Sequence, residues 1–417
     1  MKKIILKIIF SLLMICIFKS VLFIRPVKAN LSMIYVDDDN LAGPWHGTPE
    51  HPYQNITSGL EHASSNDTIF VYDGIYRENV VVNKTLSLIG ENRDTTIIDG
   101  NNNGTVIRII RDNVAITGFT IQNSGTETTD CGIFVWRCAG VTISHNTIRN
   151  SLCGINLRET NCSHITGNLI ANNSWMGVYI SPGDGNKIYF NTINQNGIGV
   201  YVRHHAVPNT LYDNNFIDNP TQAEGTAEWD NGAEGNYWSD YPGEDRNGDG
   251  IGDTDLPHLG IEYRPLIGLV TLFNAGTWQQ TTYYVHISSK STVSQFQFNS
   301  DEKVISFNID NKIGNFIFCR VAIPRQLMWC DYIEEWQVMA NTTQIPYNAT
   351  QNDDYTYIYF AYNQPTLTVY IKGTHIVREF PESRILWILI IVTFTSIIII
   401  KQRKPRDMYS KNSKNLL

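Results

Sequence analysis

Apolar and polar positions alternate in four short blocks in the middle of the chain, and each block opens with a glycine. The glycines recur every 22 or 23 residues, at Gly132, Gly154, Gly177 and Gly199. One and three places after each glycine stands Ile, Val or Leu, which is the period-two pattern of a half-buried strand. A fixed repeat of this length indicates a solenoid, whose coils bury their apolar faces by stacking on one another.

A second repeat runs in step with the first and is built on asparagine. Asn146, Asn168, Asn191 and Asn215 are each followed two residues later by isoleucine. We expect these asparagines to form a ladder of hydrogen bonds from coil to coil inside a turn. The pattern also matches half of a leucine-rich repeat, but the glycine block alternates like a strand where that fold would have a helix. Two strands per coil predict an all-β protein, a parallel β-helix.

The repeat also indicates which side chains face outward. If the residues one and three places after each glycine point inward, those two and four places after it point to solvent. The predicted core is Ile143, Ile148, Ile155, Ile165, Ile170, Val178, Ile188, Ile193 and Val200. One outward column holds Phe134, Asn156, Tyr179 and Tyr201, and the next holds Trp136, Arg158, Ser181 and Arg203.

These outward columns are the candidate ligand-binding site. Aromatic faces suit the CH faces of sugars, and the planar guanidinium of arginine suits uronate or sulfate groups. The alternative is that stacked aromatic rings only stabilise the sheet by cross-strand packing. The candidate binding residues are Phe134, Trp136, Asn156, Arg158, Tyr179, Tyr201 and Arg203.

The rest of the chain adds four segments to the solenoid. A basic start, an apolar run and small residues before position 30 predict a secretory signal peptide over 1–29. The capped β-helix is expected over 30–266, with a short helix at Tyr53–Ala63 covering its N-terminal end. Alternating runs without the repeat predict a small antiparallel β-sandwich, a stalk, over 267–380. The uncharged run 385–400 and the basic tail 401–417 predict a transmembrane helix with a cytoplasmic tail.

Charge and composition agree with an extracellular protein. The 417 residues carry 40 acidic and 32 basic side chains, a net charge of −8, so nothing indicates a nucleic-acid partner. Charged residues make up only 17%, which suits an all-β surface protein. The sequence does not indicate an oligomeric state.

One acidic loop has the spacing of a calcium site. Asp245, Asn247, Asp249 and Asp253 stand at positions one, three, five and nine, with a glycine at position six. This matches the start of a calcium-binding loop, although position twelve is a leucine where such a loop has a bidentate glutamate. We expect Ca²⁺ in a structural role, the alternative being a solvated acidic turn.

Six cysteines follow the signal segment. Cys131 and Cys153 each precede a repeat glycine, so they occupy one position in adjacent coils, and Met176 occupies it in the next coil. That spacing permits either a disulfide or two buried free thiols. A Cys/His metal site is the rival, which no CxxC pattern supports. Further candidate pairs are Cys138 with Cys162 and Cys319 with Cys330.

The outward columns offer little for catalysis. Polysaccharide lyases and hydrolases use clustered or paired carboxylates, and the columns between residues 132 and 203 hold no such pair. Glu159, with Asp184 and Arg203 at the following corners, is the best remaining group. The sequence therefore favours binding over catalysis.

Several segments resemble a known family. Asn236–Tyr241, Asn247–Thr254 and Tyr263–Leu266 resemble the closing segment of NosD-like β-helix proteins. The entry segment of that family resembles Asp67–Val80, Leu88–Asn92 and Thr96–Gly100. The resemblance covers about residues 33–266 and implies a right-handed, pectin-lyase-like helix of the carbohydrate-binding and sugar-hydrolysis type. The sandwich and anchor look like those of archaeal cell-surface proteins.

Three functional hypotheses follow. The first is a membrane-anchored, non-catalytic surface protein that binds extracellular or envelope polysaccharide. The second comes from the resemblance, because the named member of the family is a periplasmic accessory protein for copper-site maturation of nitrous oxide reductase. No Cys/His/Met copper cluster is visible in the sequence. The third hypothesis is a polysaccharide lyase or hydrolase.

Overall fold

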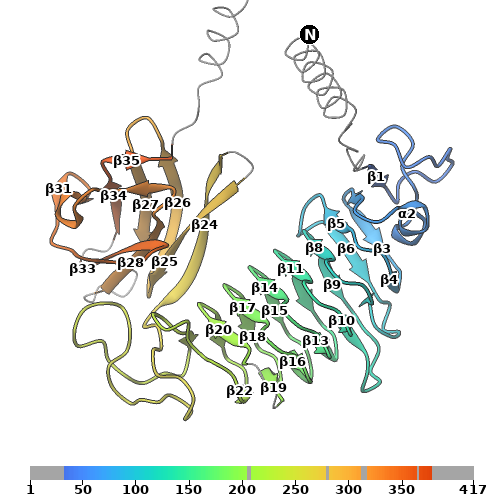
Figure 1. Ribbon diagram of the computed structural model, residues 1–417, viewed down its shortest axis with the longest axis horizontal. Coiled ribbons are helices and arrows are strands. Elements are labelled where there is room, and N and C mark those ends of the chain that lie inside the picture. Colours follow the sequence, from blue (N-terminus) through green and yellow to red (C-terminus); the bar gives the residue numbers. More distant parts are fainter. Residues whose placement is uncertain (1–31, 204–207, 279–280, 311–316, 364–365, 378–417) are drawn as a thin grey trace, which may run out of the picture. The chain divides into compact units, whose positions relative to one another are not determined.

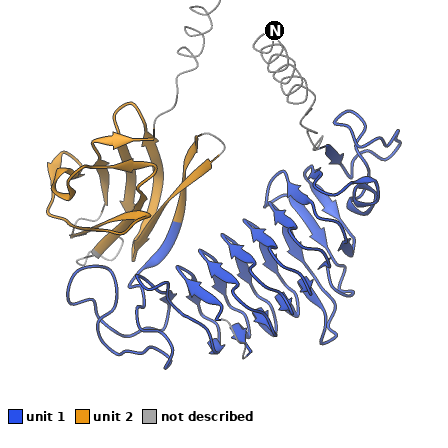
Figure 2. Cartoon of the chain, viewed as in Figure 1, with its two compact units in different colours: residues 1–271 blue, residues 272–417 orange. Residues whose placement is uncertain are grey.

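The computed structural model describes residues 32–203, 208–278, 281–310, 317–363 and 366–377. The predicted signal peptide (1–29) and the predicted membrane segment (385–400) lie outside these residues. Within the described part, no helix is long and apolar enough to cross a membrane. The chain divides into two compact units, residues 1–271 and 272–417 (Figure 2).

The first unit is a parallel β-helix whose coils stack along one axis (Figure 1). Each strand pairs in parallel with the equivalent strands of the coils before and after it, and three sheets result. A complete coil therefore contributes three strands, for example β11, β12 and β13, and the expectation of two strands per coil is wrong.

The first sheet has eight strands: β1 Met33–Val36, β2 Thr68–Val71, β5 Ser87–Gly90, β8 Ala115–Thr117, β11 Thr142–Ser144, β14 His164–Thr166, β17 Lys187–Tyr189 and β20 Thr210–Tyr212. The second sheet has seven: β4 Val80–Val82, β7 Ile107–Ile109, β10 Cys131–Trp136, β13 Cys153–Arg158, β16 Met176–Ile180, β19 Ile198–Val202 and β22 Thr221–Gly225. The third has eight: β3 Gly74–Tyr76, β6 Thr96–Asp99, β9 Thr120–Gln122, β12 Thr147–Arg149, β15 Leu169–Ala171, β18 Thr192–Asn194, β21 Asn215–Ile217 and β23 Tyr237–Trp238.

The additional strand arises because the asparagine block is bent in the middle. Between β11 and β12 lies His145, whose φ of 55° is in the left-handed region. Gly167, Phe190 and Asp213 take the same conformation at the equivalent place in later coils. The next residue in each case is an asparagine that is almost completely buried. A left-handed residue followed by a buried asparagine thus forms one corner of each coil.

The predicted asparagine ladder is confirmed. At each step the backbone N–H and the side-chain amide of one asparagine donate to Oδ1 of the next, with N···O distances of 2.9–3.2 Å. The fourth member is Asn214 and not Asn215 as expected, because Asn215 pairs with Thr192 in the strand register. The ladder therefore runs through Asn146, Asn168, Asn191, Asn214 and Asn236.

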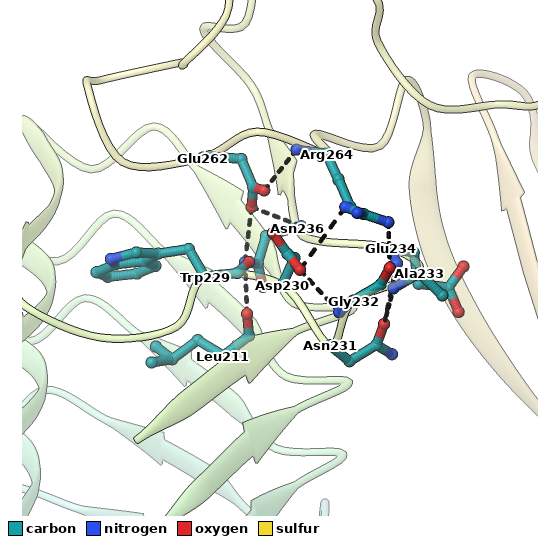
Figure 3. A network of polar contacts seen from close by, with 10 residues as sticks. All are labelled: Leu211, Trp229, Asp230, Asn231, Gly232, Ala233, Glu234, Asn236, Glu262 and Arg264. Carbon is teal, nitrogen blue, oxygen red and sulfur yellow. Dashed lines mark hydrogen bonds and ion pairs between the residues drawn. The ribbon is translucent and has the colours of Figure 1, made fainter. Parts of the chain in front are cut away.

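A glutamate ends this ladder (Figure 3). Oε2 of Glu262 accepts hydrogen bonds from the backbone N–H and the Nδ2 of Asn236, at 3.0 and 3.1 Å. Oε1 accepts from the N–H of Arg264 at 2.9 Å. Burial raises the pKa of Glu262 to about 7, although these hydrogen bonds act to lower it. The carboxyl group thus takes the place that the next asparagine would occupy.

The core and the N-terminal cap follow the sequence prediction. All nine predicted inward residues are fully buried. Helix α2, Ile56–His62, covers the N-terminal end and buries Ile56 and Leu60. Glu78 accepts hydrogen bonds from the N–H groups of Ile56 and Thr57 at the start of the helix. Lys84 donates to carbonyls at its end, so both termini of the helix are satisfied.

The second unit contains two five-stranded antiparallel sheets that share one apolar core. The alternating runs seen in the sequence lie in five of its strands, β25, β26, β27, β33 and β34. One sheet is β24 Leu269–Trp278, β25 Thr281–Ser289, β28 Ile317–Pro324, β33 Tyr355–Tyr362 and β32 Asn348–Gln351. The other is β26 Thr292–Asn299, β27 Val304–Asp310, β34 Thr366–Lys372, β30 Gln337–Ala340 and β31 Thr343–Gln344. The short strands β29 Met328–Trp329 and β35 His375–Ile376 pair, and a 3₁₀ helix, η1, spans Ile333–Glu335.

Candidate functional site

The candidate site is the outer face of the second sheet. Its strands pair so that Phe134 lies beside Asn156, Asn156 beside Tyr179, and Tyr179 beside Tyr201. Ile133, the inward neighbour of Phe134, is fully buried. The predicted register is therefore confirmed, and the first outward column is continuous over four coils.

The C-terminal half of this column presents aromatic rings. The rings of Tyr179 and Tyr201 stack with their centroids 5.6 Å apart and their planes at 20°. Both are half-buried and lie outside the solenoid core. Exposed Trp175 lies 6.2 Å from Tyr179, ring to ring. Sequence reasoning missed Trp175, although its place two residues before a repeat glycine was a usable signal. Beyond Tyr201 the column ends at exposed Glu224.

The N-terminal half of the column differs from the expectation that it faces solvent. Phe134 and Asn156 are only 7% and 8% exposed. The guanidinium of Arg108 lies 5.0 Å from the centre of the Phe134 ring and helps to cover it. Phe134 also packs against Cys131, Cys153 and Met176 in a small cluster separate from the core. Phe134 and Asn156 are therefore too buried to contact a ligand. The accessible part of the site consists of the more exposed residues of the outer face.

The second column carries the positive charge of the site. Trp136, 39% exposed, pairs with exposed Arg158 in the strand register. Beyond the strand ends, backbone hydrogen bonds still join adjacent coils. The N–H of Ser181 donates to the carbonyl of Leu157 at 2.8 Å, and the N–H of Arg203 donates to the carbonyl of Ile180 at 2.9 Å. Ser181 is buried and Arg203 is exposed. The exposed Arg158 and Arg203 are therefore separated by one coil, in which the equivalent residue is the buried Ser181.

Glu159, the best catalytic candidate from the sequence, is held by an arginine that sequence reasoning missed. Nε of Arg137 lies 2.6 Å from Oε2 of Glu159, and the Arg137 guanidinium lies 5.0 Å from the centre of the Trp136 ring. Arg137 has a φ of 55° and occupies a coil corner directly after β10. The carboxylate of Glu159 is thus partly neutralised beside the second column.

All six cysteines in the described residues are free. Cys131 and Cys153 are paired in the strand register, as the sequence indicated, and both are buried. A hydrogen bond with the thiol of Cys131, together with burial, raises the pKa of Cys153 well above its ordinary value. Cys138 is buried in the solenoid core while Cys162 is exposed. The sequence left open whether Cys131 and Cys153 form a disulfide or remain free thiols, and in the structure they are free thiols.

The acidic loop places its carboxylates against backbone N–H groups. Asp245 accepts hydrogen bonds from the N–H groups of Gly248, Asp249 and Gly250, and Asp253 accepts from the N–H and the side-chain amide of Asn247. In the described part of the chain, no three His, Cys, Asp or Glu side chains are grouped so that they could hold a metal ion. Calcium binding by Asp245, Asn247, Asp249 and Asp253 stays a prediction.

Comparison with known proteins relates the β-helix to one family. Residues 60–243 match the family model described as "Periplasmic copper-binding protein (NosD)". A "Probable ABC transporter binding protein NosD" from Stutzerimonas stutzeri is 35% identical over 118 residues, which cover 24% of this chain and 27% of the relative. A "Cell surface glycoprotein" from Methanothermus fervidus is 33% identical over 163 residues, 36% of this chain and 26% of the relative. The chain thus spans about a quarter of the length of these relatives.

A solved structure, the pectin methylesterase from Yersinia enterocolitica, aligns with 45% of this chain and 78% of its own. The sequence identity is 12% and the TM-score is 0.32, so the assignment of the fold rests on the strand pairing and not on this likeness. Over residues 60–243 the chain is similar in sequence to the NosD family, and its parallel coils form a β-helix.

Proposed function

We propose that this chain is a membrane-anchored, extracellular surface protein that binds an acidic polysaccharide on the outer face of its second sheet, without cleaving it. The polymer would lie along the stacked coils. Tyr179 and Tyr201 would contact the CH faces of successive sugar rings, and Arg158 and Arg203 would pair with their carboxylate or sulfate groups. In this proposal the solenoid is right-handed and the predicted signal and membrane segments place it outside the cell.

The observation that carries the proposal is the stacked pair of tyrosines beside two exposed arginines. Rings 5.6 Å apart on adjacent coils offer a repeated flat apolar surface, which suits a polymer made of repeated rings. The arginines add fixed positive charge in a chain whose net charge is −8. Such a local reversal of sign favours an anionic partner over a neutral one. The exposed carboxylate of Glu224 limits the favourable stretch at the C-terminal side.

A role in copper handling is the second candidate. The description of the family model supports it. This function does not require polysaccharide binding, and each can be tested without the other.

Binding of the purified full chain to a polyuronate and to an uncharged glucan tests the main proposal. We expect the polyuronate to bind more tightly, with an affinity that falls as salt is added. Arg158→Gln combined with Arg203→Gln should abolish the preference, since the guanidinium groups would be replaced by neutral amides. Lys187→Gln, an exposed cation on the first sheet, is the matched control and should change nothing. Equal binding of both polymers by the unaltered chain would refute the proposal.

A further inference from the structure

Three aromatic side chains meet on the outer face of the first sheet, at the N-terminal end where β1 lies (Figure 1). Tyr35 of β1 pairs with Phe70 of β2 in the strand register, and Tyr72 directly follows β2. The centroid of the Tyr35 ring lies 6.0 Å from that of Phe70 and 6.0 Å from that of Tyr72, and the other two are 5.3 Å apart. All three residues are half-buried and lie outside the solenoid core, so a ligand can reach them from solvent.

The angles between these rings make the cluster a corner and not a flat surface. The ring of Phe70 stands at 83° to that of Tyr72 and at 60° to that of Tyr35. A compact cation above the three centroids would lie within about 6 Å of each, the range in which a ring face attracts a cation. A corner suits such a rounded group better than a flat sugar ring, which requires parallel platforms.

Two carboxylates flank the corner. The strand register, and the backbone hydrogen bonds that continue it, place Asp37, Tyr72 and Glu91 at one position in three successive coils. Asp37 is half-buried and Glu91 is exposed. Within the described residues, neither carboxylate forms an ion pair with a lysine or an arginine. Their negative charge is therefore available to a ligand.

The electrostatic field at Tyr72 is negative. Burial, the neighbouring Tyr35 and the carboxylates of Glu91, Asp37 and Glu50 all raise the pKa of Tyr72. These carboxylates oppose a negative charge on the tyrosine oxygen, and for the same reason they attract a positive charge to the ring. Ring faces and carboxylates therefore favour the same kind of ligand.

We propose that Tyr35, Phe70 and Tyr72, together with Asp37 and Glu91, bind a small organic cation that carries an alkylated ammonium group. The ring faces contact the alkyl groups on the nitrogen, and the two carboxylates balance its charge. This site lies on the first sheet, whereas the candidate polysaccharide site lies on the second, so the two proposals are independent.

The hydrogen bonds of the carboxylates favour an alkylated ammonium group over one with several N–H donors. Oδ1 of Asp37 accepts from the N–H of Asp39 at 3.0 Å, and Oε2 of Glu91 accepts from the N–H of Asp73 at 3.1 Å. One oxygen of each carboxylate is thus already engaged, while its charge remains. The carboxylates also repel phosphate, so we expect a free cation and not the phosphate-bearing head group of a lipid.

A second three-ring corner on the same sheet provides an internal comparison. The ring of Phe190 stands at 69° to that of Tyr189 and at 71° to that of Tyr212. The strand of Tyr189 carries exposed Lys187, whose positive charge opposes the binding of a cation. The two corners are alike in shape and differ in charge.

Binding of choline to the purified full chain, followed through the NMR signal of its N-methyl protons, tests the proposal. We expect saturable binding with a dissociation constant of about 1 mM, and an upfield shift because the methyl groups lie over ring faces. The neutral analogue 3,3-dimethylbutan-1-ol has the same shape without the charge and should bind at least about tenfold more weakly. Added salt should weaken the binding of choline.

Substitutions separate the rings from the charges. Tyr72→Leu should weaken choline binding about threefold to tenfold, whereas Tyr72→Phe, which keeps the ring, should not change it. Glu91→Gln keeps the shape of the side chain and should weaken binding about threefold or more. Tyr212→Leu in the second corner and Glu61→Gln, at an exposed carboxylate on α2, are the matched controls and should have no effect.

Three results would overturn the proposal. Equal binding of choline and its neutral analogue would show that the charge is not recognised. Equal losses from Tyr72→Leu and Tyr212→Leu would place the cation outside the corner. Binding of phosphatidylcholine vesicles without binding of free choline would assign the rings to a lipid head group. If Tyr72→Leu does not fold, as judged by circular dichroism, Glu91→Gln decides the question, since unchanged choline affinity in that variant would also contradict the proposal.

Discussion

The two faces of the second sheet carry different kinds of sequence. On the inner face, Ile155, Val178 and Val200 pair in register, repeat the same apolar type and are fully buried. On the outer face, Asn156 and Tyr179 occupy equivalent places with unrelated side chains. The inner residues all pack against the coils above and below, whereas the outer residues range from buried Asn156 to half-buried Tyr179. The inner face therefore holds the coils together, and the accessible positions of the outer face are the ones that can bind a ligand.

The strongest test of this comparison removes one repeated interior residue. Asn191 donates to the carbonyl of Ile165 at 2.8 Å and accepts from Asn168. Asn191→Ala leaves these buried groups without partners, and the free energy of unfolding should fall by about 3 kcal/mol or more. Denaturation followed by circular dichroism measures the loss. Ser144→Ala, on the outer face of the first sheet, is the control and should stay within about 0.5 kcal/mol. A comparable effect of the two substitutions would contradict the comparison.

The end of the ladder should make stability depend on pH. The pKa of Glu262 is raised from 4.5 to about 7, so the folded chain holds this proton more tightly than the unfolded chain. Its stabilising contribution is complete below pH 4.5 and is lost as the pH rises through 7, a change of about 3 kcal/mol. The wild-type chain should therefore unfold more easily at pH 8 than at pH 5. Glu262→Gln should remove most of this difference, and an undiminished difference would exclude Glu262 as its source.

The acidic loop should respond to calcium with the smallest effect. Its carboxylates already accept backbone hydrogen bonds, so an ion would add to an ordered turn. Removing Ca²⁺ with a chelator should lower the melting temperature by about 2–4 °C, and Asp245→Asn should lower it without chelator. Readdition of Ca²⁺ but not of Mg²⁺ should restore it, because the loop offers more oxygen ligands than Mg²⁺ prefers. An unchanged melting temperature would leave the loop a solvated turn.

The inner face and the asparagine ladder could be predicted from the sequence because equivalent positions in neighbouring coils make the same contacts and therefore carry the same residue types. Asn146, Asn168 and Asn191 followed directly from the period. Asn214 was missed because Asn215 continues the local pattern with an isoleucine two residues later, and only the strand register separates the two. The third strand per coil was missed because the left-handed residue at the corner is not of one type. His145, for example, gives no glycine signal.

The outer face was predicted correctly in register but not in burial. Phe134 is covered by Arg108, which lies one coil before the first of the four counted blocks. Side chains that come from outside a repeat do not appear in its period. The same holds for Cys131, Cys153 and Met176, which the sequence places at one position of the repeat, while their joint burial with Phe134 is visible only in the structure.

The most direct test of the central claim compares polysaccharide binding by two double variants, each of which lacks one stacked pair of tyrosines. Tyr179 and Tyr201 stack on the second sheet at 5.6 Å, and Tyr189 and Tyr212 stack on the first sheet at 5.3 Å. Both pairs stack between adjacent coils, and the first lies beside exposed Arg158 and Arg203, whereas the strand of Tyr189 carries exposed Lys187. Replacing Tyr179 and Tyr201 with alanine should weaken binding to a polyuronate about tenfold to a hundredfold. The same change at Tyr189 and Tyr212 should leave binding unaltered. Equal effects of the two double variants, or none from the first, would contradict the account and leave the aromatic column a packing feature of the sheet.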